Sequence, residues 1–164
     1  MATNAAPIYG KQYIRYAETW EAAANAEAGS PAATAAGTTV GIVEIGELRV
    51  VAYVVSAGPN IASAPDALAP GNWTGLIAGV NQAYMPTALA QPYTARQLTV
   101  ATSGLLLVEV DPLSAAITLN SQLTVNTLGQ AASVGTSVTL DGTTPLIREN
   151  VTIGGRRLVL VSFA

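Results

Sequence analysis

Hydrophobic residues in the last third of the chain come in short runs separated by Gly, Asn, Asp and Pro. Asp141-Gly142 and Gly154-Gly155 lie between such runs and suit two-residue turns, whose central positions need positive φ. The pattern predicts antiparallel strands at residues 98–102, 105–110, 116–119, 122–125, 134–140, 146–153 and 156–163. Short strands at this spacing indicate a mainly β fold, a small antiparallel barrel or sandwich.

The preceding region, from residue 40 to residue 95, divides into a β part and an irregular part. Residues 40–45 and 48–55 are β-branched runs separated by Gly46 and Glu47, which predicts a hairpin. Residues 56–95 contain five prolines and are predicted to be loop-rich, with a short helix over 73–82 as an alternative. A long irregular segment of this kind is typical of a functional or interface loop.

The N-terminal segment has a different pattern, because its aromatic residues recur at intervals of four, three and four residues. On a helix this spacing places Tyr9, Tyr13, Tyr16 and Trp20 on one face, and Ala-rich residues follow, so a helix is predicted over residues 11–28. A strand from Tyr13 to Trp20 remains an alternative. We therefore expect an N-terminal arm and linker at 1–39, containing a short helix, and a β-rich domain at 40–164.

The amount and distribution of charge limit the classes of partner that the chain is expected to bind. The formal net charge is −3, from only 7 basic and 10 acidic residues. The basic residues are scattered, which disfavours nucleic acid as a partner because phosphate binding requires a basic stripe. Prolines interrupt the longest uncharged stretch, so no membrane span is predicted. The first residues lack a signal-peptide pattern, which predicts synthesis in the cytoplasm.

Candidate chemistry is sparse, because the chain contains no histidine and no cysteine and Lys11 is its single lysine. Nucleophiles that need an imidazole base, transition-metal sites built on imidazole or thiolate, and lysine-linked carriers are thereby disfavoured. Glu109 and Asp111 share one face of a predicted strand, and we interpret them as outward polar positions. The sequence predicts no enzyme activity and no catalytic, cofactor-binding or metal-ligating residue.

The aromatic row is the candidate protein-interaction site. Tyr9, Tyr13, Tyr16 and Trp20 either pack on their own domain or anchor the chain on another protein, because large rings give much contact area at low entropic cost. The chain is 50% hydrophobic, with a mean hydropathy of +0.39. Without a membrane span, that composition predicts apolar surface that an assembly covers.

Three segments carry a resemblance to a known family: Thr102-Ser-Gly-Leu-Leu-Leu-Val-Glu-Val110, residues 119–132, and Arg157-Leu-Val-Leu-Val-Ser-Phe163. Across residues 98–164 the chain resembles the small β-barrel cement, or decoration, proteins of tailed-phage capsids. The resemblance implies a structural protein on the outer capsid surface of the virion, bridging major capsid subunits and forming trimers.

An alternative of a different class is a carbohydrate-binding or adhesive β domain of a tail fibre or cell-surface assembly. It predicts exposed aromatic rings on the β domain. The available rings are those of Tyr53, Trp73, Tyr84 and Tyr93.

Overall fold

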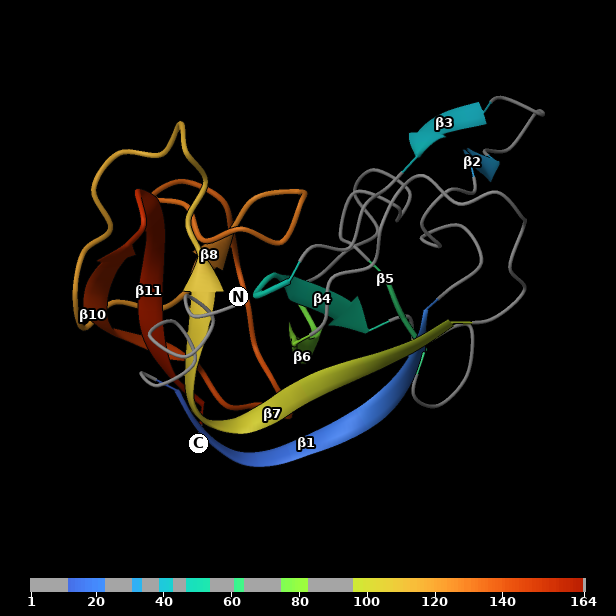
Figure 1. Cartoon of the computed structure of the whole chain (residues 1–164), viewed down its shortest axis with the longest axis horizontal. Helices are drawn as coiled ribbons and strands as arrows, with labels where there is room; N and C mark the ends of the chain where they lie inside the picture. The colour runs from blue at the N-terminus through green and yellow to red at the C-terminus, as the bar shows by residue number, and fades with distance from the viewer. Residues whose placement is uncertain are drawn as a thin grey trace.

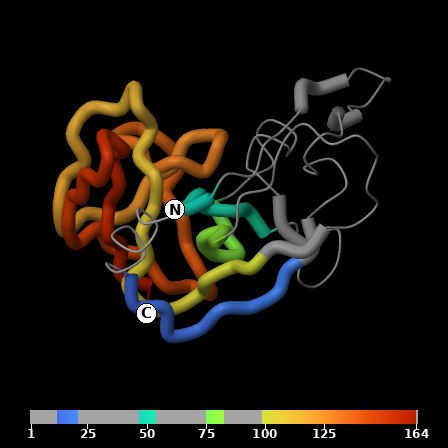
Figure 2. The backbone as a smooth tube through the Cα atoms, in the orientation of Figure 1, coloured from blue at the N-terminus to red at the C-terminus, as the bar shows by residue number. Residues whose placement is uncertain are grey.

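The computed structural model describes residues 12–22, 31–33, 39–42, 47–53, 61–63, 75–82 and 96–163, and these are built from strands, turns and loops (Figures 1 and 2). The part of the chain so described contains no helix, and therefore none that could cross a membrane. The strands are β1 (Tyr13–Ala22), β2 (Pro31–Ala33), β3 (Thr39–Ile42), β4 (Val50–Tyr53), β5 (Ile61–Ser63), β6 (Ile77–Asn81), β7 (Arg96–Glu109), β8 (Thr124–Val125), β9 (Thr136–Ser137), β10 (Leu146–Ile153) and β11 (Arg156–Phe163). The prediction of a mainly β, antiparallel fold is confirmed.

Seven strands form one sheet in the order β1-β5-β4-β6-β7-β11-β10, and β1 also pairs with β7. Every pairing in this sheet is antiparallel except that of β1 with β5. Two small sheets, β2-β3 and β8-β9, complete the described strands. The main sheet does not form a closed barrel, and β11 and β10 extend it beyond β7.

The two longest strands, β1 and β7, run alongside each other through nine residue pairs and curve together (Figure 1). Gly104 lies where they cross closely: its φ is +118°, and an added Cβ would stand 2.0 Å from the carbonyl oxygen of Tyr13. A side chain therefore does not fit there, and glycine permits the backbones to approach. The side chain of Gln12 extends the pairing by accepting a 2.9 Å hydrogen bond from the amide of Leu107.

The core lies where β4, β6, β7 and β11 meet the loops between β7 and β10. On β7, Leu106 and Val108 belong to the main cluster, whereas Leu107 belongs to a second cluster with Leu48 and Leu158. At residues 106–108 the strand thus buries both of its faces. This explains why this part of its sequence is a continuous hydrophobic run rather than an alternation of hydrophobic and polar residues.

The C-terminal hairpin matches the sequence-based prediction in both strand boundaries and turn. β10 and β11 pair antiparallel on either side of Gly154 and Gly155, whose φ values are +59° and +79°. Asp141 and Gly142 form the second predicted turn, with φ values of +48° and +74°, and the flanking residues Leu140 and Thr143 exchange backbone hydrogen bonds. Turn chemistry was therefore a sound guide at both places.

Other predicted strands need correction. The segments 98–102 and 105–110 merge into the single strand β7, because Gly104 lets the chain bend without ending the strand. Residues 116–119 form no strand, and the predictions at 122–125 and 134–140 shorten to β8 and β9. These segments contribute Ile117, Leu123 and Val138 to the core from loops, which a hydrophobic pattern does not distinguish from strands.

The predicted N-terminal helix is wrong for residues 13–22, which form β1, the alternative interpretation of this segment. Pairing with β7 outweighs the helix propensity of the Ala-rich sequence. The rest of that prediction, at 11 and 23–28, lies outside the described residues. Residues 77–81 of the alternative helix at 73–82 also form a strand, β6, which is buried throughout between β4 and β7.

The predicted hairpin between residues 40 and 55 is also corrected. Among the described strands, β3 pairs with β2, and β4 pairs with β5 and β6. Glu47 and Leu48 form a turn in which buried Leu48 has a φ of +62°. The amide of Leu48 donates to Asn81 and its carbonyl accepts from Glu109, so this turn joins β6 to β7 instead of closing a local hairpin.

Candidate functional site

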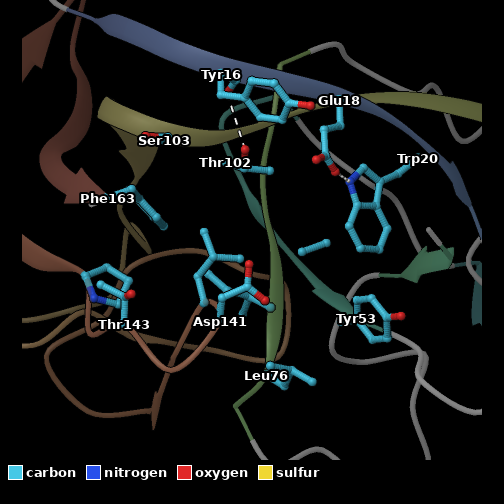
Figure 3. A pocket seen from close by; sticks show the side chains of 14 residues that line it. Tyr16, Glu18, Trp20, Tyr53, Leu76, Thr102, Ser103, Asp141, Thr143 and Phe163 are labelled. Carbon is cyan, nitrogen blue, oxygen red and sulfur yellow. Dashed lines mark hydrogen bonds between the residues drawn. The ribbon is translucent and has the colours of Figure 1, made fainter. Parts of the chain in front are cut away.

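A cleft of about 580 Å³ lies beside β1 (Figure 3). Tyr16, Glu18 and Trp20 of β1 all line it, because alternate residues of a strand point to the same side. Register shifts on either side of Tyr16 mark irregular pairing with β7 at the start of this series. The strand therefore supplies one wall of the cleft from residues two positions apart. We call this hollow the β1 cleft.

The remaining walls come from segments far apart in the sequence. β4 provides Tyr53, and the end of β11 provides Phe163 (Figure 3). The other lining residues come from the start of β6, from the middle of β7 and from the turn before β10: Leu76, Ile77, Ala78, Thr102, Ser103, Leu140, Asp141, Thr143 and Pro145. The cleft is consequently a product of the tertiary fold and not of a local motif.

Trp20 and Tyr53 line one side of the β1 cleft and contact each other. Their ring centroids are 5.1 Å apart with planes at 80°, an edge-to-face arrangement that aromatic pairs favour. Trp20 is buried, and its Nε1 donates a 3.1 Å hydrogen bond to Oε2 of Glu18. This bond satisfies the indole N–H and orients the carboxylate of Glu18 (Figure 3).

Two carboxylates give the β1 cleft its charge. Glu18 is half-buried on β1, and Asp141 is exposed on the two-residue turn, which lies below Glu18 in the view of Figure 3. None of the described residues that line the cleft is a lysine or an arginine. The cleft therefore suits a neutral or cationic ligand and repels an anionic one.

The four aromatic residues predicted to share one helix face are not aligned in the structure. Tyr9 lies outside the described residues. Tyr16 and Trp20 line the β1 cleft, but Tyr13 does not, and 64% of its surface is exposed. The helical spacing does not align the three rings, because side chains of a strand alternate with a period of two residues and the pairing of β1 with β7 shifts register on both sides of Tyr16.

A second surface, near the start of β1, is apolar and exposed. Tyr13 lies directly opposite Leu105 of β7, and Ile14 lies opposite Gly104. The exposed fractions are 64% for Tyr13 and 37% for Leu105. We call this cross-strand pair the β1–β7 patch. Exposed large hydrophobic side chains that lie directly opposite each other mark a candidate interaction surface.

Glu109 is not the outward-facing polar residue that the strand pattern predicted. Its carboxylate lies 2.7 Å from Nε of Arg49 and 3.5 Å from Nε of Arg156, and Gln130 donates to it at 3.1 Å. Burial raises the pKa of Glu109, but the hydrogen bonds from Arg49 and Gln130 and the charges of Arg49 and Arg156 outweigh burial, so the pKa lies below its ordinary value. The cluster fastens β7 to β11 and to the segment before β4.

Asp111, the other carboxylate of that predicted face, holds loops in place. It accepts hydrogen bonds from the amide of Leu113 at 2.9 Å and from Nδ2 of Asn126 at 3.1 Å. Across the described residues, no group of three or more acidic side chains assembles a metal-binding geometry. We therefore place Glu109 and Asp111 in the structural framework of the protein.

Sequence reasoning missed Glu18 and Asp141 as members of a site. The alternation of Tyr16, Glu18 and Trp20 was the available signal, since these positions share one side of a strand. Asp141 carried only a turn signal, and nothing local indicated what the turn would face. Of the rings expected for a carbohydrate-binding domain, Tyr53 lines the cleft. Trp73, Tyr84 and Tyr93 lie outside the described residues.

Comparison with known proteins gives no match for this chain: no family model, no curated protein and no solved structure matches it. Functional inference therefore depends on the β1–β7 patch and the β1 cleft.

Proposed function

We propose that this protein is a structural virion protein, a cement or decoration protein that binds the outer surface of a tailed-phage capsid and bridges major capsid subunits. The observation that carries the proposal is the β1–β7 patch. Tyr13 and Leu105 form a directly opposed cross-strand pair whose side chains remain exposed. Burial of such side chains against a partner removes apolar surface from water, which favours association.

The backbone under the patch is well suited to docking. β1 and β7 pair over nine positions, and β7 pairs in turn with β6 and β11. A patch on paired strands loses little conformational freedom on binding, so less of the interaction free energy is spent on ordering it. This favours a surface that is complementary to a fixed shape, such as an assembled shell.

Repetition adds to the strength of such an interaction. A capsid presents many identical sites, and a decoration protein that forms trimers engages several of them at once. The second contact then forms at a high effective concentration, so modest contacts by each patch give stable decoration. We therefore propose that the protein forms trimers, binds the capsid and remains on the surface of the virion.

The test uses particles assembled from the major capsid protein of the phage that encodes this chain. The whole protein is mixed with the particles, which are then separated from free protein by sedimentation. Tyr13→Ser combined with Leu105→Ser should abolish co-sedimentation, because it removes both members of the opposed pair. Failure of the unaltered protein to sediment with the particles, at any ratio, would overturn the proposal.

Leu113→Ser is the matched control. Leu113 is 93% exposed and lies in the loop after β7, outside the β1–β7 patch. The substitution makes the same change of a leucine to a serine at a side chain more exposed than Leu105, and it should leave co-sedimentation unchanged. Equal loss of binding in this control and in the patch variant would show that general hydrophobicity, rather than the patch, causes the association.

Removal of residues 1–30 is not an equivalent experiment. It deletes the whole of β1, which pairs with β7 and β5 in the main sheet. Loss of binding would then report loss of the sheet as well as loss of the patch. Point substitutions of exposed side chains separate these two effects.

A further inference from the structure

The β1 cleft has features that docking to a shell does not use. It lies on the side of β1 that carries Glu18 and Trp20, whereas Tyr13 and Leu105 take no part in its lining. Its volume, about 580 Å³, falls within the range of roughly 300–1,000 Å³ that is common for small-molecule sites. The combination of aromatic rings, carboxylates and hydroxyl groups indicates which class of molecule it suits.

Aromatic surface is available at two places around the cleft. Tyr16 is 57% exposed on β1, and Tyr53 is half-buried on β4 (Figure 3). Trp20 packs edge-to-face against Tyr53 and so helps to hold that ring in position. The negative face of an aromatic ring attracts the weakly positive C–H groups of a pyranose ring, which makes such rings suited to stacking on sugars.

Hydrogen-bonding groups surround these rings. Oε2 of Glu18 accepts a hydrogen bond from the indole of Trp20, which orients the carboxylate at the cleft. Asp141 and Thr143 add an exposed carboxylate and an exposed hydroxyl from the turn before β10 (Figure 3). Carboxylates accept from ligand hydroxyl groups, and a threonine hydroxyl both donates and accepts.

Charge and geometry decide between ligand classes. Glu18 and Asp141 repel phosphates and acidic sugars, and no described lining residue offsets them with a positive charge. A basic peptide would also be attracted to the two carboxylates, so the experiment includes such a peptide as a competing ligand. We infer that the β1 cleft binds a neutral carbohydrate, with Tyr16 and Tyr53 against its ring faces and Glu18 and Asp141 accepting from its hydroxyl groups.

The experiment is a binding measurement on the whole protein, by calorimetry, with soluble neutral oligosaccharides of glucose, galactose and mannose and with the corresponding uronic-acid oligosaccharides. At least one neutral series should bind, and its acidic counterpart should bind more weakly. Tyr16→Ala should lower the affinity for the neutral ligand by about tenfold, because roughly one stacked ring is lost. Asp141→Asn should lower this affinity severalfold while retaining the turn, because asparagine tolerates positive φ.

Tyr13→Ala is the matched control, since it removes a ring from the same strand at a position outside the cleft. It should leave the affinity within about twofold of the original value. A second diagnostic is the pair Glu18→Gln with Asp141→Asn, which removes both charges and should improve binding of the acidic oligosaccharides relative to the neutral ones.

Three results would overturn the inference. The first is the absence of measurable binding by every neutral oligosaccharide at millimolar concentration. The second is neutral binding that Tyr16→Ala leaves intact. The third is tight binding of an arginine- and lysine-rich peptide series under conditions where no oligosaccharide binds. Each of these is independent of whether the protein decorates a capsid, because the cleft and the β1–β7 patch are tested by different variants.

Discussion

The β10–β11 hairpin and the β1–β7 pair are two antiparallel pairings that this chain specifies in different ways. In the hairpin, two adjacent strands are joined by Gly154 and Gly155, and the turn sets the register. In β1–β7, strands from opposite halves of the chain meet through nine residue pairs with register shifts near Tyr16. The first pairing depends on local turn chemistry, and the second depends on long-range contacts at Gly104 and in the core.

The two pairings also differ in how many of their side chains are buried in the core and how many are exposed for binding. The hairpin contributes Val151, Leu158 and Val159 to the two hydrophobic clusters. β1 instead exposes Tyr13, Ile14 and Tyr16, and it contributes Glu18 and Trp20 to the β1 cleft. The hairpin contributes buried side chains to the core, whereas the β1–β7 pair both holds the sheet together and exposes the side chains that we propose bind partners. Substitution of exposed and of buried residues tests this division.

The largest effect is expected at Gly104. Gly104→Ala places a Cβ 2.0 Å from the carbonyl oxygen of Tyr13 and forces a φ of +118° on a residue that disfavours it. We expect a loss of about 3 kcal/mol or more in the free energy of unfolding, since backbone strain and a steric clash add together. Urea denaturation monitored by circular dichroism measures this loss.

Gly154→Ala is the control for Gly104→Ala in the hairpin. Gly154 also has a positive φ, +59°, but a Cβ there meets nothing within 4 Å. The expected loss is about 1 kcal/mol, from conformational strain alone. Equal losses in the two variants would show that the close approach of β1 to β7 is not what makes Gly104 necessary.

The second effect is expected at Glu109, which connects the two regions. Glu109→Gln removes the carboxylate between Arg49 and Arg156 while keeping its size, and we expect a loss of about 2 kcal/mol at neutral pH because two half-buried guanidinium groups lose their counter-charge. The measurement is again the free energy of unfolding.

The lowered pKa of Glu109 also predicts that the free energy of unfolding depends on pH. Its pKa in the folded protein is below the ordinary value of 4.5, so its contribution is fully present above that value and is lost as the pH falls through the folded pKa. The difference in unfolding free energy between the protein and Glu109→Gln should therefore shrink on acidification. A difference that stays constant from neutral to acidic pH would contradict the assigned ion-pair cluster.

The third effect concerns the aromatic pair under the β1 cleft. Trp20 and Tyr53 join β1 to β4 at 5.1 Å, and a double-mutant cycle with Trp20→Leu and Tyr53→Leu should give a coupling free energy of about 1 kcal/mol. Coupling near zero would mean that each ring contributes to stability only through its own burial. The same cycle with Trp20→Leu and Val151→Leu provides a pair from the two different regions, for which additivity is expected.

What could be predicted from the sequence follows the same division between local and long-range pairing. The boundaries of β10 and β11 and both two-residue turns were predictable, because each signal lies within a few residues of the structure it specifies. The helix expected over residues 13–22 was wrong because pairing with β7 decides the conformation there. Tyr16 and Trp20 were identified as candidate site residues, but their partners Tyr53 and Asp141 depend on tertiary contacts that no local spacing reveals.

The smallest effect on stability is expected for Tyr13→Ser, and it is the variant that separates the two regions most clearly. Tyr13 is 64% exposed, so the change should shift the free energy of unfolding by no more than about 0.5 kcal/mol. Val151→Ser, in the hairpin, replaces a buried side chain and should cost several times as much. If the division holds, Tyr13→Ser reduces capsid co-sedimentation with almost no loss of stability. A marked loss of stability in Tyr13→Ser would instead place the β1–β7 patch among the groups that hold the sheet together.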